Sequence, residues 1–418
     1  MDIRNFKFSV EYYYYFIGDF YTFKYQYNEA MACGFIFSGC DCEFIKFYAV
    51  FLLWKKSERN GIFNHEFFDI CIWSGKLYHA LGIGNGANGK KEMKTEILQI
   101  LRTTEDYVSG QELCDRLGVS RTAVWKTMNK LKEEGYEIEA IQNKGYHLLS
   151  YPDVVTESEI KSRLETEWAG NSIVYAEVVD STNNLAKRLG EEGKAHGTLA
   201  IAEKQTAGKG RRGRSWSAPP RLGVWMSLLL RPNLKPSCAS MLTLVSGLSV
   251  TRAIEEVTGL KMQIKWPNDI VYEGKKICGI LTEMSAEMEG IHYVVVGIGI
   301  NVNIEEFPEE LKQKATSLKI ICGKKIDRVA IVTAFLKYFE SDYSKFLKTE
   351  DLELLKMDYE YRLVNLNQKV NILDGKKEYT GTAIGIEKDG GLLVEKEDKN
   401  VVAVTSGEVS VRGVYGYV

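Results

Sequence analysis

Apolar and polar residues alternate most regularly between residues 93 and 150. Three groups of apolar residues recur there at the spacing of a helix face, which predicts three short helices. Ser109, with an acid three residues later, and Ser120 stand where helix N-caps are expected, and Gly118 stands where the second helix should end. The inward positions of the three helices are Ile97, Ile100 and Leu101, then Leu113 and Leu117, then Val124, Met128 and Leu131.

The joint Leu117–Ser120 has the length of the turn in a helix-turn-helix. Two alternating segments follow, Tyr136–Ile141 and Tyr146–Leu149, with the hairpin signal Asn143-Lys144-Gly145 between them. The pattern therefore predicts a winged helix-turn-helix over residues 93–152, which binds DNA, as a dimer on a two-part site, or serves protein contacts alone. The candidate DNA contacts on the third helix are Ser120, Arg121, Thr122, Trp125, Lys126, Asn129 and Lys130.

Buried-type strands and helices follow one another between residues 153 and 360, which predicts a domain that contains both. Gly297 and Gly299 interrupt the last strand, where glycine often marks the close approach of a ligand or another backbone. Tight packing under a helix is the alternative. The predicted strands are Ile173–Val179, Thr198–Ala202, Val224–Leu230, Ile264–Val271 with a break at Pro267, Lys276–Glu283 and Val294–Asn303, and the main helix is Pro236–Thr258.

Residues 361–418 contain short strands separated by turn signals, which predicts a five-stranded barrel of the SH3-like type. The segment Tyr415–Val418 is expected to be a tail. The predicted strands are Lys369–Leu373, Glu378–Ile386, Gly391–Glu395 and Val401–Val404.

Residues 1–92 differ from the rest of the chain. About half of the aromatic residues and half of the eight cysteines precede Met93. The segment is too apolar for ordinary disorder, yet no helical or strand period persists in it. We interpret it as an upstream extension without function, with Met93 as the native start and Gly89–Glu92 encoded by a ribosome-binding stretch. A small aromatic-rich domain of unknown role is the alternative.

Charge and cysteine content exclude several classes of protein. A net charge of -2 creates no global attraction to nucleic acid or membrane, so such binding needs a local patch. The cysteines lack the spacing of a metal site or a disulfide framework, which indicates reduced thiols in a cytoplasmic protein. No uncharged apolar run reaches the roughly 18 residues of a membrane span, and no signal peptide opens the chain.

The stretch Glu203–Trp216 has the most concentrated candidate chemistry. Its three glycines allow the backbone to turn sharply and approach a ligand, and its five cations surround that backbone with positive charge. A basic loop that ends in a tryptophan suits a phosphate-bearing ligand with a flat base. The spacing Gly208-x-Gly210-x-x-Gly213 matches a dinucleotide fingerprint, but Pro219-Pro220 excludes the helix which that fingerprint needs. No Gly-Lys-Ser/Thr closes a Walker loop. A solvated basic loop or a nucleic-acid patch is the alternative.

Small polar side chains stand at further junctions between predicted elements. Asp180–Asn183 follows a strand and starts a helix, where it can bind a polar head group or simply cap the helix. Asn268 and Asp269 stand where a strand bends at a proline. Lys276 opens the next strand, and it is either a site cation or a surface cation like its neighbour Lys275.

Together these motifs resemble those of the biotin protein ligases, in the same order. They are Asp180-Ser-Thr-Asn183, the Gln205–Arg214 loop with Trp216, Lys265-Trp-Pro-Asn-Asp269, Lys276-x-x-Gly-Ile-Leu281 and Gly297-Ile-Gly-Ile-Asn-Val302. The winged head is similar to that of bifunctional ligases that also repress biotin-synthesis genes. The resemblance spans Met93 to the C-terminus and implies an α+β multidomain fold: a winged helix-turn-helix, a mixed-sheet biotin/lipoate-ligase catalytic domain and a small SH3-like β-barrel.

The resemblance also implies a reaction and a role for each motif residue. Biotin and ATP with Mg²⁺ would give biotinyl-5′-adenylate, and biotin would then pass to a lysine of the biotin carboxyl carrier protein of acetyl-CoA carboxylase. Lys276 and Arg211 are the implied catalytic residues. The implied biotin contacts are Ser181, Thr182, Asn183, Gln205, Lys209, Gly210, Arg211, Lys276 and Gly279. The implied nucleotide contacts are Arg212, Arg214, Trp216, Asn268, Asp269 and Asn301, with Mg²⁺ near Asp269.

One residue departs from the family pattern, and two other functions stay open. Relatives often carry arginine at Lys209; backbone contacts survive that change, but bidentate phosphate recognition by the side chain does not. The second function is a ligand-sensing regulator without ligase activity, which intact Lys276, Arg211 and Asp269 argue against. The third is a lipoate ligase, and the basic glycine loop favours biotin instead. The implied repressor is a homodimer that binds the operator of biotin-synthesis genes.

Overall fold

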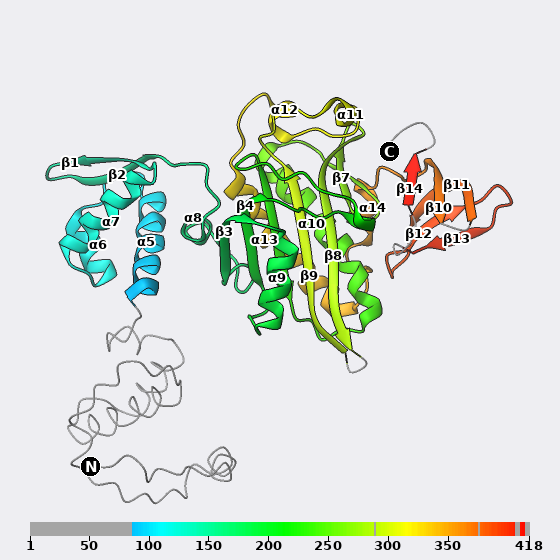
Figure 1. The fold of residues 1–418 in the computed structure, drawn as a ribbon, viewed down its shortest axis with the longest axis horizontal. Helices are drawn as coiled ribbons and strands as arrows, with labels where there is room; N and C mark the ends of the chain where they lie inside the picture. The colour runs from blue at the N-terminus through cyan, green and yellow to red at the C-terminus, as the bar shows by residue number, and fades with distance from the viewer. Residues whose placement is uncertain (1–85, 288–289, 375–376, 406–409, 414–418) are drawn as a thin grey trace, which may run out of the picture. The chain divides into compact units, whose positions relative to one another are not determined.

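The structure is a computed structural model that describes residues 86–287, 290–374, 377–405 and 410–413 (Figure 1). Most of the aromatic-rich segment interpreted as an extension lies outside these residues, and so does the expected tail Tyr415–Val418. The described part contains a helical head, a large mixed sheet with helices on its faces and a small antiparallel sheet. This order of parts confirms the predicted fold class.

The head contains the three predicted helices and the predicted hairpin. Ser109 caps the second helix by accepting a hydrogen bond from the Glu112 N–H at 3.0 Å. The predicted capping box is only half formed, because the Glu112 carboxylate pairs with Arg116. The first helix begins at Gly86, upstream of the Met93 at which the pattern placed its start. The elements are α5 (Gly86–Thr103), α6 (Gly110–Leu117), α7 (Arg121–Glu133), β1 (Glu137–Ile141) and β2 (Gly145–Ser150).

The wing packs tightly against the helices of the head. β1 and β2 form an antiparallel hairpin, and Val108 bridges Tyr146 on its inner side. Gly145 has a φ of 123°, and a Cβ atom there would lie 2.1 Å from the Val108 carbonyl oxygen, so the position requires glycine. The helices and the hairpin enclose an apolar core of their own.

The central domain is built on a seven-stranded sheet with the order β3-β4-β5-β9-β8-β7-β6. β3 and β4 are parallel, and the other neighbours are antiparallel. The single strand predicted around Pro267 is two strands, because a turn with a cis Trp266–Pro267 peptide separates them. The strands are β3 (Ile173–Val179), β4 (Thr198–Gln205), β5 (Gly223–Leu230), β6 (Gln263–Lys265), β7 (Asp269–Tyr272), β8 (Lys275–Glu287) and β9 (Gly290–Asn301).

Helices cover both faces of this sheet, with α10 and α13 on one face and α9 on the other (Figure 1). Side chains alternate between the two faces along each strand. Among the described residues, only Pro236–Thr258 is long and apolar enough to span a membrane, and 78% of its window is buried, as in a core helix. The helices are α8 (Glu157–Lys161), α9 (Thr182–Glu191), η4 (Pro236–Met241), α10 (Leu242–Thr258), α11 (Glu309–Lys312), α12 (Leu318–Cys322), α13 (Arg328–Thr349) and α14 (Lys356–Arg362).

A buried arginine ties the start of the central domain to β4. Arg328, the first residue of α13, is fully buried and donates to the Glu203 carboxylate at 2.7 Å and to the Asp153 carboxylate at 2.8 Å. Glu203 also accepts from the Val155 N–H at 3.1 Å. Hydrogen bonds and opposite charges on both sides compensate the desolvation of the guanidinium. The segment after the head is therefore anchored to the strand that leads into the basic loop.

The C-terminal part is a five-stranded antiparallel sheet with the order β13-β12-β11-β10-β14. The four predicted strands are confirmed, and β14 is the fifth. Trp266 of the central domain donates from its indole N–H to the Gly390 carbonyl at 3.0 Å. The strands are β10 (Lys369–Asp374), β11 (Lys377–Ile386), β12 (Leu392–Glu395), β13 (Val401–Val404) and β14 (Ser410–Gly413).

Candidate active site

The basic loop folds back on itself as a narrow hairpin after β4. The Trp216 N–H donates to the Gly208 carbonyl at 2.8 Å, and the Gly210 N–H donates to the Arg214 carbonyl at 2.7 Å. A single 3-10 turn, η3 (Arg211–Gly213), forms the tip. No helix follows the glycines in this loop, as the prolines predicted, so the dinucleotide interpretation is excluded by geometry as well.

The base of the loop is attached to the end of β3 and the start of α9. The Ala207 N–H donates to the Asp180 carbonyl at 2.8 Å. The Lys209 ammonium donates to the Asn184 side-chain oxygen at 2.7 Å, so this lysine holds the loop against α9. The ammonium of Lys209 therefore points to α9 and holds the loop against that helix.

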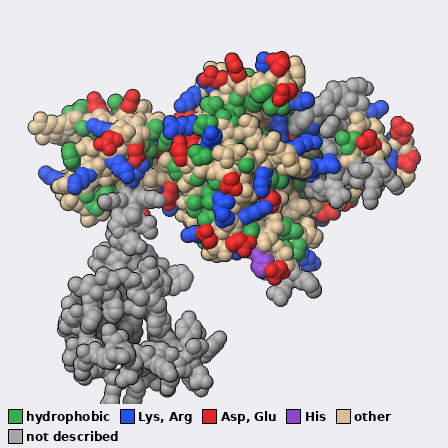
Figure 2. Space-filling view, viewed as in Figure 1, with side chains coloured by type: hydrophobic (Ala, Val, Ile, Leu, Met, Phe, Trp, Pro, Cys, Tyr) green, Lys and Arg blue, Asp and Glu red, His purple; other side chains and the backbone are tan. Residues whose placement is uncertain are grey.

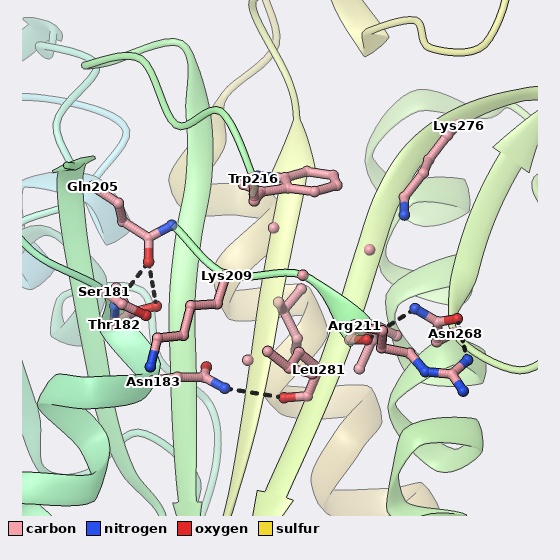
Figure 3. A pocket seen from close by; sticks show the side chains of 16 residues that line it. Ser181, Thr182, Asn183, Gln205, Lys209, Arg211, Trp216, Asn268, Lys276 and Leu281 are labelled. Carbon is pink, nitrogen blue, oxygen red and sulfur yellow. Dashed lines mark hydrogen bonds between the residues drawn. The ribbon is translucent and has the colours of Figure 1, made fainter. Parts of the chain in front are cut away.

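A hollow with an empty volume of about 440 Å³ lies between this loop and the sheet. Figure 3 shows its two ends: Ser181, Thr182, Asn183 and Gln205 at one, and Arg211, Asn268 and Lys276 at the other, with Trp216 between them. Eleven of the predicted site residues are thus brought together from four separate motifs. The lining residues are Ser181, Thr182, Asn183, Gln205, Lys209, Gly210, Arg211, Trp216, Asn268, Lys276, Gly279, Ile280, Leu281, Gly297, Ile298 and Gly299.

The first end is a cluster of small polar side chains at the N-terminus of α9. Ser181 occupies the N-cap position but makes no side-chain capping bond, so simple capping does not explain it. The Thr182 N–H donates to the Gln205 side-chain oxygen at 2.8 Å. Asn183 lies over Gly297, where a Cβ atom would be 1.9 Å from its side-chain oxygen. The glycine thus makes room for a site residue of α9.

The second end carries the cations. The Lys276 ammonium lies 2.6 Å from the Asp269 carboxylate and 5.1 Å from the centre of the Trp216 ring. Arg211 donates to the Asn268 side-chain oxygen at 2.9 Å, which joins the loop to the turn before β7. Burial lowers the pKa of the Arg211 guanidinium, while the Asp269 charge acts in the opposite direction. Both cations face one region, and such an arrangement stabilises negative charge that develops there.

Trp216 forms the wall between the two ends. A Cβ atom at Gly299 would lie 2.7 Å from its indole nitrogen, and one at Gly279 would lie 3.0 Å from its ring edge. The indole nitrogen is buried without a hydrogen-bond partner. The two glycines leave room for an aromatic ring against the sheet, so the close neighbour of Gly299 is a side chain of the basic loop, neither the ligand nor the second backbone that the sequence predicted.

Four predicted nucleotide contacts do not line the hollow. Arg212 and Arg214 are exposed at the loop tip. Asn301 is buried and donates to the Thr316 carbonyl at 3.2 Å, so a neighbouring segment covers it. Asp269 is held behind the lining by its ion pair with Lys276.

Several lining residues were not predicted as site residues, and strand alternation is the signal that could have found them. Leu281 points to the same face of β8 as the predicted Gly279, and Gly297 and Gly299 point to the same face of β9. The register places Leu281 opposite Gly297 and Gly279 opposite Gly299. A floor made largely of glycine and aliphatic residues fits a flat apolar part of a ligand.

The described part of the chain holds no candidate metal cluster, and its cysteines are unpaired. No group of three or more His, Cys, Asp or Glu residues there could hold a metal ion. The described cysteines are all unpaired, and burial raises the pKa of Cys278, the one nearest the hollow. The charged side chains that line the hollow are instead the cations Lys209, Arg211 and Lys276.

The predicted DNA-binding face is exposed on α7. Trp125 has a relative exposure of 56%, and Thr122, Lys126 and Lys130 are exposed as well. Arg121 is exposed but its guanidinium donates to the Gln111 side chain at 2.7 Å. Figure 2 shows basic and acidic side chains mixed over the visible face, so the positive charge for DNA must be local.

Comparisons with known proteins agree with this geometry. A bifunctional ligase/repressor BirA from Bacillus subtilis is 41% identical over 314 residues, which cover 74% of this chain and 96% of that protein. The chain belongs to the biotin protein ligase family. A BirA from Escherichia coli is 30% identical over 308 residues, which cover 73% of this chain and 94% of the relative. The biotin protein ligase membership predicted from the motifs is thus confirmed.

Family models and solved structures cover the same three parts. The biotin/lipoate A/B protein ligase family matches residues 175–301, an HTH domain matches 94–147, and a biotin protein ligase C-terminal domain matches 366–412. A biotin protein ligase from Aquifex aeolicus in complex with biotin and ATP is 36% identical with a TM-score of 0.52. It covers 58% of this chain and 99% of its own. The helix-turn-helix is therefore the first of three domains of a biotin ligase.

Proposed function

We propose that the chain makes biotinyl-5′-adenylate from biotin and ATP, transfers biotin to a lysine of a biotin carboxyl carrier protein, and represses biotin-synthesis genes. The observation that carries the proposal is that one hollow has a polar, uncharged end and a cationic end. Biotin has the matching shape: a neutral cyclic urea at one end and a carboxylate at the other. The family membership and the N-terminal helix-turn-helix support the two activities.

The polar end is proposed to bind the urea ring. Ser181, Thr182, Asn183 and Gln205 supply buried or half-buried hydrogen-bond groups at the N-terminus of α9. The ring and its side chain would lie along the glycines of β8 and β9, with the Lys209–Arg211 backbone closing from above. A site of this kind discriminates strongly, because a ligand without the urea leaves its polar groups unpaired.

The cationic end is proposed to join the carboxylate to the phosphate. Attack of a carboxylate on ATP brings two anions together, and the Lys276 and Arg211 charges offset the repulsion and stabilise the charge on phosphorus. Trp216 and Asn268 would contact the nucleotide, Asn301 would support that side, and Arg212 and Arg214 would reach phosphate when the loop closes. The Asp269 carboxylate fits Mg²⁺ poorly while it is paired with Lys276, so the phosphates of ATP would hold most of that ion.

Exclusion of water is the proposed task of the loop. A mixed anhydride of biotin and AMP hydrolyses readily, and a glycine-rich loop that orders over it keeps water out until the carrier lysine arrives. The small C-terminal sheet is proposed to help hold ATP and the carrier protein. These steps need no nucleophile from this chain.

Repression is proposed to require a homodimer in the cytoplasm. A single α7 offers few base and phosphate contacts, and a two-part operator doubles them. β3 is the outer strand of the central sheet and pairs only with β4 among the described residues, and Val178 on it is 55% exposed. An open strand edge is a surface at which a second copy can pair. Ligand binding would order the loop attached to the end of β3 and favour that pairing.

Incubation of a protein that starts at Met93 with ATP, labelled biotin and a carrier domain tests the ligase. We expect label on a carrier lysine and biotin-dependent release of pyrophosphate, with lipoate failing to compete. Pyrophosphate release without transfer would show adenylation alone. The absence of both reactions would indicate a ligand-sensing regulator. Preference for lipoate would identify the other ligase type. Loss of activity that is restored by residues 1–92 would assign a role to that segment.

A further inference from the structure

The basic loop is fastened to the walls of the hollow at two points, by side chains that are two residues apart. Lys209 donates to the Asn184 side-chain oxygen of α9 at 2.7 Å, and Arg211 donates to the Asn268 side-chain oxygen at 2.9 Å. Figure 3 shows the two side chains leaving the loop toward opposite ends of the hollow, Lys209 toward the polar end and Arg211 toward the cationic end. We call these two contacts the Lys209 fastening and the Arg211 fastening.

The acceptor in the Lys209 fastening has a fixed orientation. Asn184 donates from its amide nitrogen to the Asp180 carboxylate at 2.5 Å, and Arg188 donates to the other carboxylate oxygen at 3.2 Å. Asp180 is ionised at neutral pH and only accepts, so the Asn184 amide oxygen faces away from it. An ammonium only donates, so Lys209 requires the same orientation of that amide. Asn184 thus links a cation of the loop to an acid that precedes α9.

A second carboxylate lies near the Lys209 ammonium. Burial raises the pKa of Glu283, on β8, while hydrogen bonds from Lys187 and Asn183 and the nearby charge of Lys209 lower it, and the lowering prevails. Glu283 and Asp180 are therefore both negative on the α9 side of the loop. Their charges attract the ammonium of Lys209 and favour its place on α9.

The two fastenings face different parts of the proposed ligand. The urea ring at the polar end is neutral, so it does not compete with Asn184 for the Lys209 ammonium. The carboxylate and the phosphate at the cationic end are anions, and an anion attracts the Arg211 guanidinium more strongly than the neutral Asn268 amide does. Ligand binding thus opposes the Arg211 fastening and leaves the Lys209 fastening intact.

We propose that Asn184 is a positioning residue that keeps one side of the basic loop fastened throughout the reaction, while Arg211 moves from Asn268 to the ligand. The inference rests on the proposed function, in which the loop retains biotinyl-adenylate. Asn184 does not line the hollow, so it acts on the intermediate only through Lys209 and the loop. The side chain of Lys209 serves this contact and does not bind phosphate.

The test is a double-mutant cycle on the half-life of protein-bound biotinyl-adenylate. Asn184→Leu and Lys209→Met each remove one partner, and each should shorten the half-life about 5-fold, the scale of one hydrogen bond. The double variant should lose no more than either single variant, because all three lack the same contact. Lys209→Arg retains a cationic donor and should keep the native half-life. Lys204→Met, at an exposed position of β4 outside the hollow, is the matched control and should keep it as well.

Trypsin cleavage of the ligand-free protein gives a second readout that does not require catalysis. Arg212 and Arg214 are exposed at the loop tip, and cleavage after them should be faster in both single variants and equally fast in the double variant. Faster cleavage confined to the loop follows from a lost fastening. Faster cleavage within α9 and the central sheet would indicate a damaged fold and would overturn the positioning role.

The outcomes distinguish this inference from the proposed function. Losses that multiply to about 25-fold in the double variant would show that Asn184 and Lys209 act independently. That result would overturn the inference, and so would native half-lives in both single variants. A native protein that forms no biotinyl-adenylate would overturn the proposed function. The cleavage rates would then decide about the fastening alone, and rates unchanged from the native protein would overturn it.

Discussion

Lys276 and Lys275 are adjacent on β8, yet their surroundings differ. The Lys276 ammonium is enclosed by the Asp269 carboxylate and the Trp216 ring, whereas Lys275 is exposed. A cation held between a carboxylate and an aromatic face is oriented before the reaction, so its charge stabilises phosphorus without reorganisation. The neighbour has no such partner in the hollow.

Replacing Lys276 with alanine should therefore lower the rate of biotin adenylation by about 10²–10³-fold, the usual loss when one preorganised donor is removed. Circular dichroism and thermal unfolding should remain close to those of the native protein. Lys275→Ala is the matched control and should keep the native rate. Wild-type adenylation by the Lys276 variant would show that the lysine has no catalytic role.

At this scale the sequence predicted the residues that touch the hollow better than those that orient them. Thr182 and Gln205 stand in motifs with glycine or helix-start signals, and these signals are local. Ser227 on β5 and Glu283 on β8 hydrogen-bond the Asn183 side chain, but they lie in ordinary strand sequence, and these contacts depend on which strands are neighbours. Strand order brings β5, β9 and β8 together, and a single sequence does not state that order.

The hairpin of the basic loop leaves no room for a side chain at Gly208. A Cβ atom at Gly208 would lie 2.5 Å from the Trp216 carbonyl oxygen, while one at Gly210 would lie 3.3 Å from the Arg214 carbonyl oxygen. Gly208→Ala should open the hairpin and shorten the half-life of bound biotinyl-adenylate, by about 10-fold. Gly210→Ala should have the smaller effect. The rate of adenylate release and hydrolysis measures both, and an equal half-life in the Gly208 variant would count against closure by this hairpin.

The junction of β3 and α9 should be insensitive to mild acid. Burial alone would raise the pKa of Asp180, but hydrogen bonds from Asn184 and Arg188 lower it to about 2 from an ordinary 3.8. A lowered pKa means that the stabilisation by this carboxylate is complete above pH 3.8 and is lost as the pH falls through about 2. At pH 3.8 the NMR signals of the first turn of α9 should still be those of ionised Asp180. Half-titrated signals at that pH would contradict the hydrogen bonds from Asn184 and Arg188 to Asp180.

Elements with strong local signals were predicted with accurate ends, and those that depend on distant partners were not. Ser109 and Gly118 mark the ends of α6 because capping is a local interaction. β14 has no such signal, and it exists because β10 offers an open edge to pair with. The half-formed capping box has a local cause, because Arg116, one turn later on α6, competes for the Glu112 carboxylate.

At the scale of the whole molecule, three parts with separate sequence signatures make one enzyme. The head has its own apolar core, whereas the core of the central domain continues into the C-terminal sheet through residues such as Val370 and Ile386. The sequence predicted the parts because each has its own periodicity. It did not predict that the last two share a core, because that requires knowing which faces remain open after each has folded.

The arginine at the start of α13 has a consequence for any attempt to excise the regulatory part. Cutting the polypeptide after residue 153 would remove Asp153, one of the two acids that neutralise Arg328. The guanidinium would then be paired with Glu203 alone, which lies two positions before Gln205. A shortened protein without the head must therefore keep Asp153, or replace Arg328, to hold β4 and the basic loop that follows it in place.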